Sequence, residues 1–302
     1  MNPMHHLLCV LLMTLALLGP VPDAHARGAA PCEIATRSER VGNGTIVYNI
    51  VGKGPTLLLI HGLFAEKEQW NGLACELAAA GFTALAVDLP GYGRSTGFAL
   101  PGYRLERQVE LLHTLTQRLG VERLDVAGSS MGGAIATLYA ARYRGQVRSL
   151  AFIGSPLGII DWASGVRDAI YRGVNPFIPI DAQEFALELR LLFVKPPDIL
   201  AAERDAIIAD YVARNRHFVQ VWNIVNLYDG VLWRESAPRL PTLIVWGTAD
   251  RIYDVTGAER LHRRMPGSTV RRLPDAGHLL LMENASQAAS LYLGFLRARA
   301  AR

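Results

Sequence analysis

Short hydrophobic runs, separated by longer stretches with helical spacing, form the dominant pattern of this sequence. Thr56 to Ile60 is a continuous apolar run, and Phe82 to Val87 and Leu124 to Ala127 are short, mainly apolar segments; each of the three ends at a polar residue or glycine. Runs of this kind are typical of strands buried on both faces of a parallel sheet. Further strands are predicted at residues 45–51, 147–153, 241–246 and 269–273.

Hydrophobic residues between these runs recur every three to four positions, which predicts amphipathic helices. The helices are expected at residues 66–80, 103–119, 131–143, 255–265 and 286–299. Strands that alternate with helices at this spacing predict an α/β fold with a doubly wound, mostly parallel sheet.

The alternation stops between residues 157 and 234, where the sequence is helical and turn-like and rich in large apolar residues. We expect an insertion of short helices here, while residues 27–156 and 235–302 form the core. An apolar cap over an apolar pocket is the functional interpretation of this insertion. Ile159, Phe193 and Trp222 are the cap residues expected to line the pocket, although most apolar residues of the insertion should pack its own interior.

The first 26 residues have the features of a secretory signal. Leu7 to Leu18 is an apolar segment well short of the ~20 residues that a membrane-spanning helix needs. Ala24-His-Ala26 is a cleavage site of the A-x-A type, so we expect cleavage near Ala26 and a secreted or periplasmic protein. Because Met1 to His6 contains no Lys or Arg, an uncleaved membrane anchor is the alternative.

The chain contains three cysteines, and cleavage would remove Cys9. An even pair in an exported protein predicts a disulfide between Cys32 and Cys75. Two unpaired thiols are the alternative.

Charge and composition exclude several classes of partner. The net charge is +4, but the basic residues are scattered rather than gathered in a stripe with aromatic residues, so no nucleic acid is expected. The loop Asp88 to Ser95 has two of the glycines of a dinucleotide fingerprint, but Thr96 stands where the third is needed. There is no HExxH motif and no Cys/His cluster with ligand spacing, so neither a cofactor nor a metal is expected.

The residues after Ala127 carry the first chemical signal. Gly128-Ser-Ser-Met-Gly132 fits the pattern G-x-S-x-G, the nucleophile elbow between a strand and a helix. The serine of such a turn has a positive φ, which costs on the order of 1–3 kcal/mol, and only very small residues fit two positions away. Ala127 and Met131 exclude a motif centred on Ser129, so Ser130 is the candidate nucleophile.

A serine nucleophile needs a base within hydrogen-bond reach and a carboxylate that orients the base. In this architecture the chain order is Ser, then Asp, then His, which Asp250 and His278 satisfy. Both follow predicted strands, so they should meet Ser130 at the carboxyl edge of the sheet, where open α/β sheets bind ligands. The residues weighed against them are His61, expected to buttress its turn, the helical His113, His217 and His262, and the carboxylates Asp161 and Asp275.

The attack of a serine on an ester creates an oxyanion, which backbone N–H groups can stabilise. The amide of Met131, at the start of the elbow helix, is one expected donor. The second is expected from the loop after His61-Gly62, with the amide of Leu63 preferred and that of Phe64 as the fallback. The side chains of Phe64 and Met131 should also help to line the acyl pocket.

Several motifs together resemble the α/β-hydrolase-fold serine hydrolases, and within them most resemble the bacterial family V lipases and the monoacylglycerol-lipase-like esterases. The resemblance spans about residues 45–298. The motifs are His61-Gly-Leu-Phe64 with Lys67 and Trp70, Asp88-Leu-Pro-Gly-Tyr-Gly-Arg-Ser95, Gly128 to Gly133, Trp246-Gly-Thr-Ala-Asp250, Asp254-Val-Thr-Gly-Ala258, Gly277-His278 with Met282-Glu283, and Val194-Lys-Pro-Pro197.

The resemblance implies a helical cap inserted after the sixth strand and a cofactor-free hydrolase of carboxylic esters, often lipid esters. The related dehalogenases and epoxide hydrolases need a carboxylate at the elbow, and Ser130 argues against both. Other Ser-triad hydrolases, namely C–C bond hydrolases, peptidases or perhydrolases, are the alternatives, followed by a non-catalytic ligand-binding protein of the same fold. Peripheral contact of the cap with a membrane or lipid interface is a further expectation, and the sequence leaves the oligomeric state open.

Overall fold

The computed structural model describes residues 32–227, 231–234 and 236–300. The expected signal segment 1–26, with Cys9, lies outside these residues. The described residues form one eight-stranded sheet in the spatial order β1-β2-β4-β3-β5-β6-β7-β8. Its strands are β1 (Ala35–Val41), β2 (Gly44–Val51), β3 (Thr56–Ile60), β4 (Thr83–Val87), β5 (Leu124–Ser130), β6 (Val147–Pro156), β7 (Thr242–Gly247) and β8 (Ser268–Leu273).

The sheet is mostly parallel, which confirms the predicted fold class. β4, β3, β5, β6, β7 and β8 run parallel to one another, and β1 and β2 add an antiparallel edge. Because parallel strands end on the same side, the loops after β3 to β8 gather along one edge of the sheet. Every site residue named from the sequence in the core lies on or near this edge.

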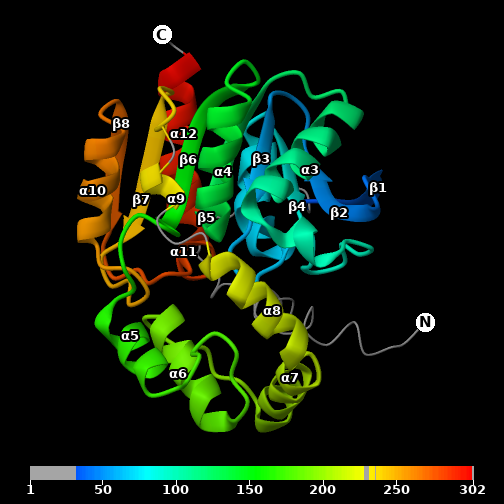
Figure 1. The fold of residues 1–302 in the computed structure, drawn as a ribbon. Helices are drawn as coiled ribbons and strands as arrows, with labels where there is room; N and C mark the ends of the chain where they lie inside the picture. The colour runs from blue at the N-terminus through cyan, green and yellow to red at the C-terminus, as the bar shows by residue number, and fades with distance from the viewer. Residues whose placement is uncertain (1–31, 228–230, 235, 301–302) are drawn as a thin grey trace.

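Helices cover both faces of the sheet (Figure 1). Alternate side chains of β3 enter different hydrophobic cores: Leu57 and Leu59 face one, and Leu58 and Ile60 face the other. This double burial explains why the strand reads as an unbroken apolar run. One face carries α2 (Asn71–Ala79) and α12 (Ala285–Ala300). The other face carries α3 (Leu105–Arg118), α4 (Met131–Arg142) and α10 (Thr256–Arg264). Three short elements complete the core, η2 (Lys67–Trp70), η3 (Leu100–Tyr103) and α11 (Leu280–Glu283).

The edge strand β1 was not predicted from the sequence. Its residues are Ala-Thr-Arg-Ser-Glu-Arg-Val, and five of the seven are polar. β1 pairs only with β2, across the tight turn at Gly42, so one neighbour and partial burial are enough to hold it. An edge strand of this kind leaves no hydrophobic run in the sequence.

The segment after β6 is helical and lies beyond the carboxyl edge of the sheet (Figure 1). Its own hydrophobic cluster includes Phe185, Ile207 and Phe218. We call residues 157–234 the cap, although the structure leaves residues 228–230 undescribed. The cap helices are α5 (Ser164–Tyr171), α6 (Ala182–Leu192), α7 (Ala201–Ala213), α8 (Asn215–Asn226) and α9 (Val231–Arg234).

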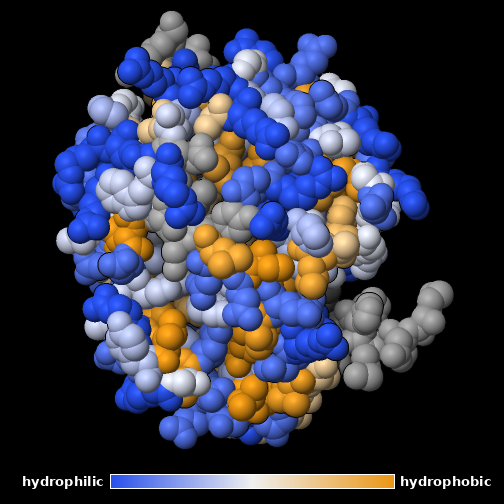
Figure 2. Space-filling model, viewed as in Figure 1, coloured by the Kyte–Doolittle hydropathy of each residue, from blue (hydrophilic) through white to orange (hydrophobic). Residues whose placement is uncertain are grey.

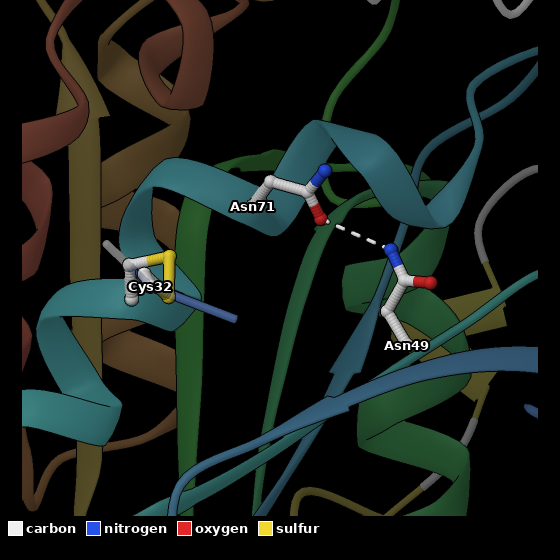
Figure 3. The surroundings of a disulfide bond; sticks show 4 residues. Cys32, Asn49 and Asn71 are labelled. Atoms are coloured by element: carbon white, nitrogen blue, oxygen red, sulfur yellow. Dashed lines mark hydrogen bonds between the residues drawn. A yellow bond between two sulfur atoms is a disulfide. The ribbon is translucent and has the colours of Figure 1, made fainter. Parts of the chain in front are cut away.

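A disulfide joins Cys32, just before β1, to Cys75 in α2, with an S–S distance of 2.04 Å (Figure 3). Close to it, Asn49 of β2 donates from Nδ2 to Oδ1 of Asn71 at the start of α2, across 3.1 Å. The covalent bond and the hydrogen bond together tie the antiparallel edge of the sheet to its first covering helix.

None of the described helices combines the length and the apolar character that crossing a bilayer requires. In the described part of the chain, no group of three or more His, Cys, Asp or Glu side chains is arranged to hold a metal ion.

Candidate active site

Ser130 is the last residue of β5 and immediately precedes α4. Its backbone has φ 52° and ψ −120°, a conformation that is strained for a residue with a side chain. A Cβ on Gly128 would lie 2.1 Å from the carbonyl oxygen of Gly132, and one on Gly132 would lie 2.1 Å from that of Ile60. Both glycines are therefore required by close backbone approach, which is the physical basis of the G-x-S-x-G pattern.

The turn after β3 lies directly beside this serine. A Cβ on Gly62 would lie 3.2 Å from Cβ of Ser130 and 3.8 Å from its Oγ. The Ala65 amide donates to the Gly62 carbonyl across 3.3 Å, which places Leu63 and Phe64 at the tip of a tight turn. Phe64 has a φ of 56°, so this turn is strained like the elbow opposite it. The loop expected to supply the second oxyanion donor thus faces the candidate nucleophile.

His61 supports this turn from behind, as expected. The Leu89 amide donates to Nε2 of His61 across 3.0 Å, so Nδ1 carries the proton and donates to the Gly62 carbonyl at 2.7 Å. His61 is completely buried, and desolvation lowers its pKa to about 4. The ring is therefore neutral and fixed between two loops, which makes it a structural residue.

Asp88 and Lys67 form a buried ion pair next to the same turn. The Lys67 ammonium lies 2.9 Å from Oδ2 of Asp88, and the Lys67 amide donates to Oδ1 across 2.9 Å. The Arg94 amide donates to Oδ2 as well, and Ser95 Oγ donates to the Asp88 carbonyl. These bonds hold the loops after β3 and β4 together, so Asp88 and Ser95 are structural.

Asp250 and His278 are brought together by the loops after β7 and β8. His278 Nδ1 lies 3.0 Å from Oδ2 of Asp250, and the two side chains are 5% and 1% exposed. The other oxygen, Oδ1, accepts from the amides of Ile252 and Tyr253 at 2.8 and 3.0 Å. The carboxylate is thus fixed by backbone donors on one side and can orient the imidazole with the other.

Ser155 was missed by the sequence analysis as a member of this group. Its Oγ donates to Oδ2 of Asp250 across 2.6 Å and lies 3.0 Å from Nδ1 of His278. Ser155 belongs to β6, which lies between β5, the strand of Ser130, and β7, the strand that Asp250 follows. The only signal in the sequence that could have identified it is its place near a strand end on the carboxyl edge, which it shares with Ser130 and Asp250.

Ser130 and His278 line one cavity beneath the cap. Within the described residues no hydrogen bond joins the Ser130 hydroxyl to the imidazole. Nucleophile–base contacts are often long in the absence of substrate and shorten when it binds. The described arrangement therefore brings the candidate nucleophile, the candidate base and the turn of Leu63 to the same space.

The cavity has a volume of about 1310 Å³ including its open mouth, and its walls are mainly apolar. Phe64, Met131, Phe193 and Trp222 line it, each as expected. The expectation for Ile159 was wrong. This residue is completely buried in the hydrophobic core below the cap, and its carbonyl accepts from the Trp233 indole.

The residues weighed against the triad lie elsewhere. His113 stacks on Tyr143, His217 contacts the Gly91 carbonyl, and His262 contacts the Ser268 hydroxyl. Asp161 borders a separate small pocket, and Asp275 occupies a turn with a φ of 52°. None of these five residues lines the main cavity of the described structure.

Glu283 is a second residue whose role the sequence did not reveal. Its Oε1 accepts from the Val194 amide at 2.8 Å and from the Lys195 amide at 3.3 Å. Its Oε2 accepts from the Gly277 amide at 3.0 Å, next to His278. One carboxylate therefore connects a loop of the cap to the loop that carries the candidate base.

Comparisons with known proteins identify the family of this fold. A family model described as alpha/beta hydrolase fold matches residues 55–285. Lipase 1 of Psychrobacter immobilis is 30% identical over 249 residues, which is 80% of this chain and 77% of that protein. The monoacylglycerol lipase ABHD6 of Bos taurus is 27% identical over 259 residues, 81% of this chain and 76% of that protein. The crystal structure of a membrane phospholipase A, called a novel bacterial virulence factor, superposes with a TM-score of 0.83 at 31% identity and covers 97% of this chain and 93% of that one.

Proposed function

Because this chain belongs to the alpha/beta hydrolase fold family, whose model matches residues 55–285, we propose that it is an ester hydrolase of the lipase and esterase type. In this proposal Ser130 is the nucleophile, His278 the base and Asp250 the residue that orients it. The amides of Met131 and Leu63 hold the oxyanion, with Phe64 as the alternative to Leu63. The named relatives are lipases, which supports carboxylic esters as substrates.

In the first step, the Ser130 hydroxyl attacks the ester carbonyl carbon while His278 Nε2 accepts its proton. The imidazolium that forms is stabilised by Asp250, whose Oδ2 already lies 3.0 Å from Nδ1. The negative charge moves to the carbonyl oxygen, where the two amides donate to it. Removal of one such donor typically costs about 3–4 kcal/mol of transition-state stabilisation.

Collapse of the tetrahedral intermediate breaks the bond to the alcohol oxygen, which takes the proton from His278 and leaves. A water molecule then attacks the acyl-serine while His278 accepts one of its protons. The second collapse releases the carboxylic acid and returns the proton to Ser130. The cycle consumes one ester and one water and needs neither a cofactor nor a metal ion.

The observation that carries this proposal is the shared cavity: Ser130, with its strained φ of 52°, and the Asp250-paired His278 both open into it. The direct test is labelling of the purified protein with a fluorophosphonate probe. We expect stoichiometric labelling that Ser130→Ala abolishes, while Ser129→Ala, which changes the neighbouring serine, remains reactive. An unlabelled wild-type protein would refute the proposal.

Substrate class is tested with p-nitrophenyl esters of increasing chain length. The wide apolar cavity supports activity on medium and long acyl chains, since burial of each methylene contributes about 0.8 kcal/mol. A preference for butyrate would indicate an esterase rather than a lipase. The unlabelled wild-type protein can also be assayed with peptides, with C–C bond substrates and with an ester plus hydrogen peroxide, which separates peptidases, C–C bond hydrolases and perhydrolases from the proposed ester hydrolase.

Export of the protein is the second part of the proposal. Residues 1–26 would be removed near Ala26, with an uncleaved anchor as the alternative. The Cys32–Cys75 disulfide supports export, because such bonds form and persist in oxidising compartments. N-terminal sequencing of the protein recovered from periplasm and medium would identify the cleavage site.

The cap, residues 157–234, is further proposed to contact a lipid interface. Of the nine large hydrophobic side chains exposed in the described structure, all but Leu100 belong to it. Figure 2 shows apolar side chains on the lower lobe, where the cap helices lie. Leu200 and Leu227 are 72% and 70% exposed. Flotation with liposomes would test this, and Leu200→Ser together with Leu227→Ser should weaken the association.

A further inference from the structure

One carboxyl group of the cavity has no part in the proposed catalytic steps. Glu188 lies on the inner side of α6, between Phe185 and Leu191, and is 6% exposed. It lines the same cavity as Ser130. Its surroundings are largely apolar, and a polar group in such a place is costly unless something hydrogen-bonds to it.

Only one of the two oxygens of this carboxyl group has a hydrogen-bond partner in the described residues. The Tyr211 hydroxyl donates to Oε1 of Glu188 across 3.2 Å. The second oxygen, Oε2, has no hydrogen-bond partner within the described residues, and no cation there pairs with the carboxyl. Arg214, next to the helix that carries Tyr211, is instead paired with Asp210. Glu188 thus presents an unpartnered polar atom in a cavity of substrate size.

Burial also determines the chemical form of this group. Desolvation raises the pKa of the Glu188 carboxyl to about 8. Near neutral pH it is therefore mainly protonated and can both donate and accept a hydrogen bond. A cationic ligand would require the ionised form, which burial disfavours, whereas a neutral hydroxyl group complements the protonated form.

Tyr211 connects this pair to the catalytic end of the cavity. Its ring centroid lies 5.0 Å from that of Phe218, which in turn lies 5.1 Å from Phe64. Phe64 belongs to the turn that faces Ser130. Ring contacts through Phe218 therefore connect the proposed oxyanion turn to the polar pair, and Phe64, Tyr211 and Glu188 all line the same cavity.

We propose that Glu188 and Tyr211 form a polar subsite that binds a hydroxyl group of the substrate. The preferred esters then carry a free hydroxyl either on the alcohol, as in a monoacylglycerol, or along the acyl chain. This inference rests on the proposed ester hydrolase function. In this inference Glu188 and Tyr211 determine specificity in an otherwise apolar pocket, because a few polar groups in such a pocket fix the orientation of the ligand.

The test compares three esters of one acyl length: methyl decanoate, 1-monodecanoylglycerol and methyl 10-hydroxydecanoate. For the wild type, we expect kcat/KM to be higher for at least one hydroxylated ester than for methyl decanoate. In Glu188→Leu the ratio of these two values should fall about tenfold, the size expected for one lost hydrogen bond to a buried group. Glu188→Gln keeps a donor and an acceptor and should retain most of the ratio.

The ester whose ratio falls identifies the source of the hydroxyl group. Tyr211→Phe is a second variant that keeps the ring, and it should lower the same ratio about threefold through its effect on Glu188. Glu203→Leu makes the same chemical change on α7 outside the cavity and is the matched control. The inference is overturned if, for each of the two hydroxylated esters, the ratio of its kcat/KM to that of methyl decanoate is the same in the wild type, in Glu188→Leu and in Tyr211→Phe. If the wild type hydrolyses none of the three esters, the proposed function itself is wrong.

Discussion

The Ser155 hydroxyl donates to the Asp250 carboxylate across 2.6 Å, and it reaches the oxygen that also faces His278. This bond restricts the rotation of the carboxylate and so helps to aim the imidazole at Ser130. Ser155 touches no reacting atom in the proposed mechanism, so it is a positioning residue.

We predict that Ser155→Ala lowers kcat about fivefold to tenfold, the loss expected for one hydrogen bond to a charged group, with little change in KM. Ser155→Thr keeps the hydroxyl and should recover most of the activity. The pH profile of kcat should shift in the alanine variant, because Asp250 loses a donor that competes with the imidazolium. Stopped assays across pH measure both effects.

The matched control for that experiment is Ser149→Ala. Ser149 lies on the same strand and donates to a buried carboxylate, Asp125, also across 2.6 Å, but away from the cavity. It should lose stability without any change in the pH profile. Equal kinetic effects of the two alanine variants would show that Ser155 acts only through stability.

We predict that Glu283 couples the cap to the loop that carries His278, the proposed base. In Glu283→Ala the amides of Val194 and Gly277 lose their acceptor, so hydrogen exchange should accelerate at residues 192–196 and 276–279. We expect kcat/KM to fall about tenfold, because the base and a pocket wall both become less ordered. Glu259→Ala, on the surface of α10, is the control and should leave exchange in both segments unchanged.

The elbow glycines should tolerate no side chain. Gly132→Ala would place a Cβ 2.1 Å from the Ile60 carbonyl oxygen, so the backbone must move, and we expect a loss of about 3 kcal/mol or more in unfolding free energy. Gly145→Ala meets nothing within 4 Å and should be close to neutral. Urea unfolding of both variants checks the contrast, and equal midpoints would contradict it.

The elements that could be predicted from the sequence are those in which burial or a close backbone contact determines the residue types of a short segment. The core strands appear as apolar runs because they are buried on both faces, and the elbow is readable because two backbone contacts exclude every side chain but hydrogen. Ser130 and Asp250 could be singled out because each lies at or just after the end of such a strand, and His278 because its glycine-containing loop follows the next predicted strand along the chain. That they catalyse a reaction remains the proposal argued above.

The residues that the sequence did not reveal depend on packing between distant segments. Ser155 is one serine at a strand end, and only its contact with Asp250 distinguishes it. Glu188 lies at helical spacing between Phe185 and Leu191 and faces inward with them, but only its contact with Tyr211 of α7 reveals a role. Ile159 was misplaced for the same reason, since an apolar residue near a cap suits the core as well as the pocket.

The disulfide should contribute strongly to stability. Cys32 and Cys75 are separated by 43 positions, and by the chain-entropy model closure of such a loop stabilises the fold by about 4 kcal/mol. The double variant Cys32→Ala with Cys75→Ala should lose about that amount in urea unfolding. Reducing agent should destabilise the wild type and leave the double variant unchanged. A free-thiol count of two on the denatured, exported protein would contradict the bond.

Glu188 should make stability depend on pH in a direction opposite to that of an ordinary carboxylate. Burial raises its pKa to about 8 from an ordinary value of 4.5. Between these two pH values the folded protein keeps the proton and the unfolded chain has lost it. The contribution of Glu188 to stability is therefore complete below about pH 4.5, declines as pH rises and levels off above about pH 8.

Glu188→Gln removes this titration, so the difference in unfolding free energy between the variant and the wild type should grow in favour of the variant from about pH 5 to pH 8. His61, with its pKa lowered to about 4, changes stability in the opposite sense at acidic pH, but it is present in both proteins and cancels in the difference. Tyr211 has a pKa raised well above 10.0 and does not titrate in this window. Urea unfolding at closely spaced pH values measures the difference, and a constant value across the range would show that Glu188 is ionised in the folded protein.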